Sequence, residues 1–394
     1  MRPRKGPGVT FRTQAGILSM EDYMVVDHNL NLTGLGLEVQ KLEESGVSKG
    51  KAIAMVSEQY FKDLRVKNIS RAQGCLMGQL VGDSLGSLVE FQTPAQIRQD
   101  YPDGVRDLAD GGPFQLIAGQ PTDDSEMALA LARSLVEHNG YDKQAVRRAY
   151  VQWIQSGPFD CGPTIAGALR GHMNPDSQAN GAMMRVSPLG IWGARNFSED
   201  GIDHWAEEDA LITHPNPVCV DANILFARAI GDAIRNPQMQ GERYPGPDQH
   251  GYDPQIPLEV YELYSEIESW AECAESAVEE TVKAARNSPP PSYTRQMGWV
   301  LIAFHNALYQ LLHAHSFEEA LVDTVMRGGD TDTNAAICGA LLGAVYGLEA
   351  IPARWREAVL NCRPSPDNPR TKCPRPECYW PVDALTLAQQ LLGE

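Results

Sequence analysis

Two stretches of this chain place hard oxygen ligands immediately before a helix-forming run. The first, PTDDSEMALALARSL, contributes Thr122, Asp123 and Asp124. The second, RGGDTDTNAAICGALLGAVYG, contributes Asp330, Asp332 and Thr333. Magnesium and manganese prefer carboxylate, hydroxyl and water oxygens, and a cation offsets the mutual repulsion of crowded aspartates. The repeated pattern therefore predicts one shared site for two divalent cations, Mg²⁺ or Mn²⁺.

Helix capping is the alternative explanation for either cluster alone, because Thr and Asp are also favoured at the first turn of a helix. Asp123 and Asp124 are adjacent, so on a helical turn their side chains point about 100° apart and can serve different cations. Two clusters of Thr with paired Asp, each followed by small apolar residues, favour the metal interpretation over two independent caps.

A glycine-rich segment precedes the first cluster. In AQGCLMGQLVGDSLGSLVEF the glycines at 74, 78, 82 and 86 are four residues apart, which places them on one face of a helix. Because glycine inside a helix costs about 1 kcal/mol relative to alanine, this face predicts close packing or a neighbouring site. Glu90 follows and is a candidate general acid or base, with an ordinary exposed glutamate as the alternative.

Three other places carry weaker signals. Asp160, in GPFDCGPT, is also explained by a simple turn. The loop SQANGAMMR holds Asn180 and Gly181, where backbone can approach a phosphate or a ribose hydroxyl, although no strand precedes it as in a phosphate-binding loop. His214, in THPNP, is a single histidine, and single histidines are more often structural than catalytic.

The elements that must position these residues are helices. Alternating strand patterns are nearly absent, so we predict one all-α domain over 71–394, preceded by an arm or small subdomain over 1–70. The arm is expected to hold one short helix over 47–64, and the polar stretch 236–257 is expected to be an exposed insertion. Apolar spacing of three and four residues predicts further helices at about 122–138, 142–156, 219–235, 258–286, 296–314, 317–327, 332–347 and 384–392.

Composition limits the classes of partner. The chain has 394 residues, 43% of them hydrophobic, which is enough for a sizeable core. Its formal charge of −18 argues against nucleic-acid binding. There is neither an apolar run of about 20 residues nor a recognisable signal peptide, so no membrane association and a reducing cytoplasm are expected. Cys75 and Cys338 are expected to be buried thiols, and the spacing of Cys362, Cys373 and Cys378 disfavours a zinc site.

Six of these motifs together resemble the ADP-ribosylglycohydrolase family. The resemblance covers about 71–362, in the order GQLVGDSLGSLVEF, PTDDSEMALA, GPFDCGPT, NGAMMRVSPLGI, THPNP and RGGDTDTNAAICGALLGAVYG. It implies an all-α bundle around a two-metal cleft that usually holds Mg²⁺ or Mn²⁺. Ser125 stands where many members have threonine, a mild departure because the preceding ligands are intact.

The resemblance also implies roles for individual residues. The two halves of the metal shell fall on Thr122, Asp123, Asp124, Asp330, Asp332 and Thr333. Glu90 falls where the family has a mobile, metal-linked glutamate with a catalytic role. Asp160 falls where the arginine-directed members have an aspartate that contacts the ribose and assists proton transfer. The loops lining the ADP-ribose groove fall on Ser177, Asn180, Gly181 and His214.

The expected function is removal of mono-ADP-ribose from modified protein side chains, with arginine preferred and serine left open. The long arm over 1–70 is similar to that of immunity proteins that block an ADP-ribosyltransferase toxin, which makes such a toxin a candidate partner. Two alternatives remain: a non-catalytic toxin-binding immunity protein, and a two-metal phosphohydrolase acting on a nucleotide.

Overall fold

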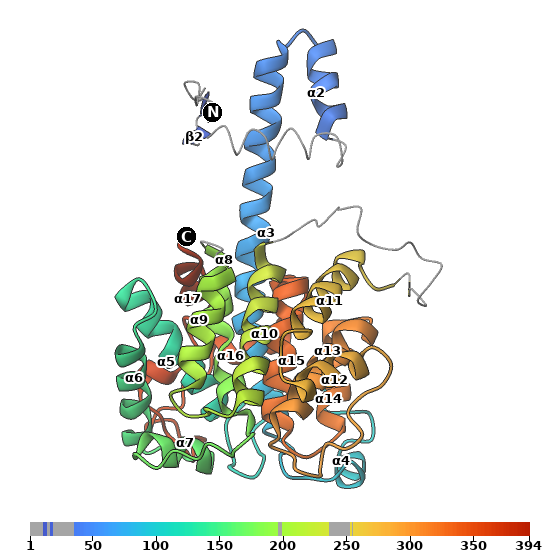
Figure 1. The fold of residues 1–394 in the computed structure, drawn as a ribbon. Coiled ribbons are helices and arrows are strands. Elements are labelled where there is room, and N and C mark those ends of the chain that lie inside the picture. Colours follow the sequence, from blue (N-terminus) through green and yellow to red (C-terminus); the bar gives the residue numbers. More distant parts are fainter. Residues whose placement is uncertain (1–10, 14–15, 19–34, 196–198, 236–252, 254) are drawn as a thin grey trace, which may run out of the picture. The chain divides into compact units, whose positions relative to one another are not determined.

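A computed structural model describes the chain except for residues 1–10, 14–15, 19–34, 196–198, 236–252 and 254. The described chain divides into two compact units, the first ending at Asn68 and the second beginning at Ile69 (Figure 1). Most of the insertion expected over 236–257 lies outside the described residues. None of the helices that the structure describes has the length and apolar character needed to cross a membrane.

The first unit contains a short antiparallel strand pair and a helical hairpin. Strand β1 (Phe11–Thr13) pairs with β2 (Gly16–Leu18). Helix α2 (Leu35–Glu44) packs against the first part of α3 (Lys49–Gly86) through a small apolar cluster that includes Val39, Ala52, Ile53 and Val56. This unit therefore has its own small core.

Helix α3 differs from the expectation of a short helix over 47–64. It is one helix of 38 residues that extends through the glycine-rich segment to Gly86. The segment RVKNISRAQ, which joins the two expected parts, contains neither proline nor glycine, so nothing in it stops a helix. The prediction of a separate short helix was wrong for this reason.

The regular elements among the described residues of the second unit are all helices, which confirms the all-α fold class. Its helices are α4 (Pro94–Asp100), α5 (Asp123–His138), α6 (Lys143–Gln155), α7 (Pro163–Leu169), α8 (Ser187–Arg195), α9 (Glu199–Ala210), α10 (Pro217–Arg235), α11 (Leu258–Ala271), α12 (Ser276–Ala285), α13 (Val300–His313), α14 (Phe317–Met326), α15 (Thr331–Tyr346), α16 (Ala353–Leu360) and α17 (Ala384–Leu392), with 3₁₀ turns η1 (Asn180–Arg185), η2 (Leu348–Ala350) and η3 (Glu377–Tyr379).

The one long helix expected over 258–286 is two helices in the structure: α11 ends at Ala271 and α12 begins at Ser276. The helix expected over 296–314 begins only at Val300, after a loop. Short helices such as α4 were not predicted. That helix did have a local signal, since Thr93 and Gln96 form a reciprocal capping box at its start.

Helices α3 and α15 contact each other backbone to backbone. A Cβ added at Gly78 would overlap the carbonyl of Gly339, and one at Gly82 would overlap the carbonyl of Ala335. At the end of α3, a Cβ on Gly86 would overlap the backbone at Thr331 and Asp332. We call this contact the glycine seam. It explains the four-residue spacing of glycine on α3, and it brings the end of α3 to the start of α15.

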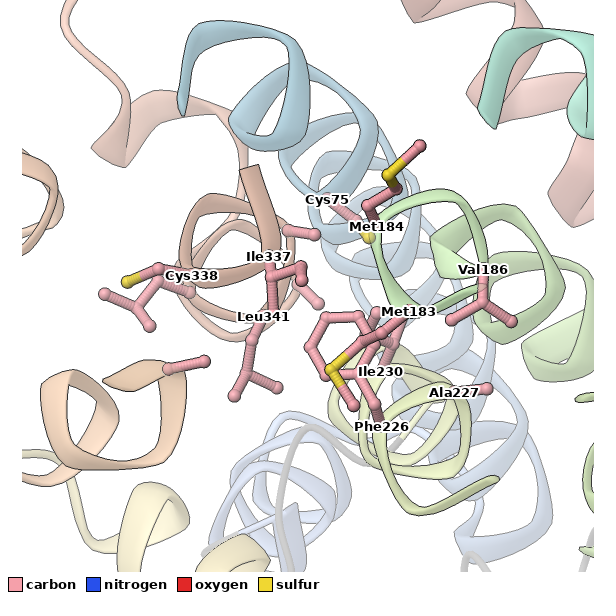
Figure 2. Close-up of a cluster of buried hydrophobic side chains, with 14 of the residues drawn as sticks. Cys75, Met183, Met184, Val186, Phe226, Ala227, Ile230, Ile337, Cys338 and Leu341 are labelled. Atoms are coloured by element: carbon pink, nitrogen blue, oxygen red, sulfur yellow. The ribbon is translucent and has the colours of Figure 1, made fainter. Parts of the chain in front are cut away.

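An apolar core surrounds the glycine seam. Met183 of η1 lies beside Phe226 and Ile230 of α10, with Ile337 and Leu341 of α15 nearby (Figure 2). All five side chains are buried. Cys75 and Cys338 are buried too, as expected. The core thus holds together the elements whose ends carry the polar motifs.

Candidate active site

The polar motifs meet in one cavity of about 270 Å³ in the second unit. Of the candidate site residues, those lining it are Glu90, Asp123, Asp124, Asp160, Asn180, Gly181, His214, Asp330, Asp332 and Thr333. Thr122 and Ser177 do not line it. Segments some two hundred positions apart therefore converge as the two-cluster interpretation requires.

Six carboxylates face this cavity, and no lysine or arginine is among its described lining residues. Glu90, Asp330 and Asp332 each offer an oxygen within 4.8 Å of the others. Burial, followed by the charges of Asp160 and Asp330, raises the pKa of Glu90 to about 9. Burial and neighbouring acids also raise the pKa of Asp332 and Asp124 well above the ordinary range. The cavity thus gathers carboxyl groups that cannot all ionise together unless a cation offsets their charge.

The first cluster is held by a residue that the motif analysis missed. Thr122 precedes α5, but its hydroxyl lies 3.2 Å from Asp124 Oδ2 and does not cap the helix. The carboxylate of Asp83, from α3, accepts the backbone N–H groups of Thr122 and Ser125, both at 3.1 Å. Burial raises the pKa of Asp83 to about 6. Because Asp83 caps α5 from another helix, the carboxylates of the motif remain free to face the cavity.

The second cluster is clamped to the segment that carries Glu90. Phe91 N–H donates to the Gly329 carbonyl at 2.8 Å, and Gly329 N–H donates to the Gln92 carbonyl at 2.9 Å. Gly329 has φ +83° and lies against the Tyr293 carbonyl, so only glycine fits there. This clamp places Glu90 beside Asp330, the residue that precedes α15.

Phe91 is held in a strained backbone conformation at the mouth of the cavity. Its φ is +66°, which is rare for a bulky residue, and its side chain is 55% exposed. Met297 is the other exposed apolar residue lining the cavity. Neither residue had a signal in the sequence, because each depends on a loop conformation set by tertiary contacts.

The candidate residues in loops had only weak signals in the sequence. Asn180 Nδ2 donates to Asp330 Oδ2 at 2.7 Å, so it joins the second cluster directly. Asp160 is half-buried and accepts the N–H of the next residue, Cys161, at 2.8 Å. Ser177 pairs with Thr164 at 2.8 Å between their hydroxyls, behind the cavity wall.

His214 is buried beside Gly181 and is neutral. Burial, followed by the charge of Arg185, lowers the pKa of His214 to about 3. Its Nδ1 lies 2.8 Å from Thr213 Oγ1, and its Nε2 has no hydrogen-bond partner. A buried nitrogen without a partner on the wall of a cavity is suited to bind a polar ligand atom.

The donor set fits divalent cations. Glu90 Oε2 and Asp124 Oδ1 are buried and accept no hydrogen bond. Buried carboxylate oxygens without a donor are costly unless a cation or a ligand satisfies them. Among the described residues, Glu90, Asp330 and Asp332 form the one group of three acids, cysteines or histidines close enough to share an ion. The three C-terminal cysteines are free thiols outside that group.

The helical fold and its cavity of paired acids can now be compared with known proteins. The model of the ADP-ribosylglycohydrolase family matches residues 64–381, and the chain belongs to this family. The resemblance noted in the sequence is therefore confirmed.

Individual relatives agree with this assignment. The chain is 30% identical to the ADP-ribosyl-[dinitrogen reductase] glycohydrolase of Rhodospirillum rubrum, over 72% of this chain and 88% of that protein. It is 26% identical to the ADP-ribosylarginine hydrolase Tri1 of Pseudomonas putida (strain GB-1), over 74% of each chain. A solved structure titled ADP-ribosylglycohydrolase-related protein complex shares the fold, with a TM-score of 0.64 and 24% identity, over 83% of this chain and 98% of that one.

Proposed function

We propose that this protein hydrolyses the N-glycosidic bond between ADP-ribose and a protein side chain, with arginine as the preferred acceptor. The observation that carries the proposal is the convergence of six carboxylates in one cavity that no described lysine or arginine lines. Relatives named for hydrolysis of ADP-ribosylarginine and of ADP-ribosylated dinitrogen reductase support the substrate class.

Two cations, Mg²⁺ or Mn²⁺, would be held by the two clusters. The residues that face the cavity for this purpose are Asp123, Asp124, Asp330, Asp332 and Thr333, with Glu90 beside them. Thr122 would join them only if its hydroxyl turned from Asp124. Bound cations would supply Lewis-acid polarisation and orient the hydroxyls of the distal ribose.

The chain's own residues would handle the protons. Hydrolysis adds water at the anomeric carbon, breaks the C–N bond and leaves a proton on the departing nitrogen. Guanidine leaves poorly unless that proton arrives in time, so a dedicated acid is needed. Glu90, which lies beside Asp330 and Asp332, and the half-buried Asp160 are the two candidates. Neutral His214 and the Asn180–Gly181 backbone would bind other parts of the nucleotide.

A product assay tests this function. Proteins ADP-ribosylated on arginine or on serine would be incubated with the enzyme, with and without a chelator. We expect release of intact ADP-ribose from the arginine-linked substrate, and loss of that activity with the chelator. Release of AMP instead would support the phosphohydrolase alternative, because it requires cleavage of the pyrophosphate.

A toxin-blocking role for residues 1–70 is a further proposal, supported by the separate first unit with its own helical hairpin. Deleting residues 1–65 should abolish binding to a cognate toxin while the hydrolase remains active. Undiminished binding would contradict the role of the arm. If the Asp123 and Asp332 variants protected cells fully, the non-catalytic alternative would be correct instead.

The thermal stability of the cation-free protein is expected to fall as pH rises. Because the pKa of Glu90 is raised from its ordinary 4.5 to about 9, stability from its protonated form is fully present below pH 4.5. That stability is lost as pH rises through 9. Calorimetric melting with a chelator, at intervals from pH 5 to 9, measures the slope. Adding Mg²⁺ or Mn²⁺ should flatten it, and a chelated protein that gains stability with pH would contradict the prediction.

A further inference from the structure

A buried arginine near the C-terminus, Arg375, pairs with the first helix of the candidate site. Its side chain is 2% exposed, and that of its partner Glu126 is 1% exposed. Arg375 Nε lies 2.8 Å from Glu126 Oε1, and an Nη atom lies 2.8 Å from Oε2. This two-pronged geometry is one that arginine makes and lysine cannot.

Glu126 lies in the first turn of α5, two residues after Asp124. The same carboxylate also accepts the indole N–H of Trp153, from α6, at 2.8 Å. Neither Glu126 nor Arg375 lines the cavity. The ion pair therefore fixes the first turn of α5 from behind, on the side away from any substrate.

The guanidinium of Arg375 also binds the end of α6. It donates to Ser156 Oγ at 2.8 Å and to the Ser156 carbonyl at 3.3 Å. Four residues further on is Asp160, which faces the cavity. In the intervening loop, the ring of Phe159 packs 5.3 Å from that of Phe114. The Arg375 side chain thus links the first turn of α5, which carries Asp123 and Asp124, to the start of the loop that carries Asp160.

The backbone that carries Arg375 is itself anchored. Its N–H donates to the Pro364 carbonyl at 2.9 Å, and its carbonyl accepts the Trp380 indole N–H at 2.8 Å. Gln120, two residues before Thr122, donates to the Cys373 carbonyl at 2.7 Å. Prolines at 374 and 376 restrict the chain on both sides. The guanidinium is therefore presented from a fixed base.

We propose that Arg375 is a positioning residue that sets Asp123 and Asp124 in register with Asp160. The inference rests on the proposed function, in which the first two residues hold cations and the third assists proton transfer. Without Arg375, the register of α5 and the loop after α6 would rest on the Trp153–Glu126 hydrogen bond and on Gly162 N–H, which donates to Asp123 Oδ2 at 3.4 Å. The C-terminal segment, which carries cysteines but no metal group among its described residues, then has a defined role in the site.

The test compares R375K with R133K. Arg133 lies on α5, the helix that carries Glu126, and it does not line the cavity. It binds the same C-terminal segment as Arg375 does, through the Cys378 carbonyl and Asp383. Mn²⁺ binding, measured by calorimetry without substrate, should weaken about 10-fold in R375K, and kcat on arginine-linked substrate should fall about 10- to 100-fold. R133K should change neither by more than about twofold, because Arg133 bonds to Cys378 and Asp383 and not to Glu126 or Ser156.

S156A provides a second measurement that does not depend on the folding of R375K. It removes one link to the Asp160 loop and keeps the Arg375–Glu126 pair. We expect a lower kcat, with KM and Mn²⁺ affinity near those of the wild type. Wild-type Mn²⁺ affinity and kcat in folded R375K, or wild-type kcat in S156A, would overturn the positioning role. A wild-type protein that neither binds Mn²⁺ nor releases ADP-ribose would instead overturn the proposed function beneath it.

Discussion

Replacing Asp332 with asparagine is expected to abolish turnover and, at the same time, to stabilise the cation-free protein. Asp332 is buried against Glu90 and Asp124, and both burial and these charges raise its pKa. Asparagine keeps the shape, removes the charge and can donate to the neighbouring carboxylates. We expect kcat to fall about 100-fold or more and the melting temperature with chelator to rise by about 2 °C or more.

An exposed carboxylate gives the matched control. D367N changes the same functional group on the surface of the second unit, where stability should move by less than about 0.5 kcal/mol. Mn²⁺ titration and far-UV circular dichroism complete the measurement, since D332N should lose metal affinity and keep its helicity. Full activity in folded D332N would contradict the two-cation interpretation.

Replacing Gly82 with alanine is expected to be among the most destabilising single-methyl changes in the second unit. Its Cβ would overlap the Ala335 carbonyl, and a backbone cannot move aside as a flexible side chain can. Overpacking of this kind costs about 3 kcal/mol or more when helices must separate. Activity should fall as well, because the displaced helix α15 begins at Thr331, beside Asp332. Urea unfolding followed by circular dichroism measures the loss.

G50A is the control for this change. Gly50 lies near the start of the same helix, and a Cβ there would meet nothing within 4 Å. Alanine should be neutral or should stabilise the helix by about 0.5–1 kcal/mol. Equal behaviour of the two variants would show that the glycine seam is not tightly packed.

Much of the site could be predicted from the sequence, because its chemistry is concentrated in short motifs. Asp123 and Asp332 are recognisable from residue type and from their place at the start of a helix, and the fold brings both to one cavity. The four-residue glycine spacing correctly indicated a close backbone contact. Long amphipathic helices were recognisable for the same reason, since their pattern repeats over several turns.

The residues that support the site had no such pattern. Asp83 is a single acid in an apolar helix, and only the fold shows that it caps α5. Arg375 lies in a proline-flanked segment whose cysteines drew attention to zinc instead. Short helices such as α7 and α8 bury their faces through tertiary contacts rather than through periodicity. In each case the information is a partner distant in the chain, which local reasoning does not contain.

The glycine seam also governs how α3 and α15 can move. Side chains that interdigitate can change rotamer and let helices slide by small amounts, but bare backbones in contact have no such adjustment. If α15 slid along α3, a side chain of α3 would overlap the Ala335 or Gly339 carbonyl. The overlap would end only when the next glycine of α3 reached that carbonyl, four residues or about 6 Å further along. The two helices can therefore slide only in steps of this size. We expect Glu90, which follows α3, and Asp332, in the first turn of α15, to be either adjacent or fully separated, with no intermediate spacing.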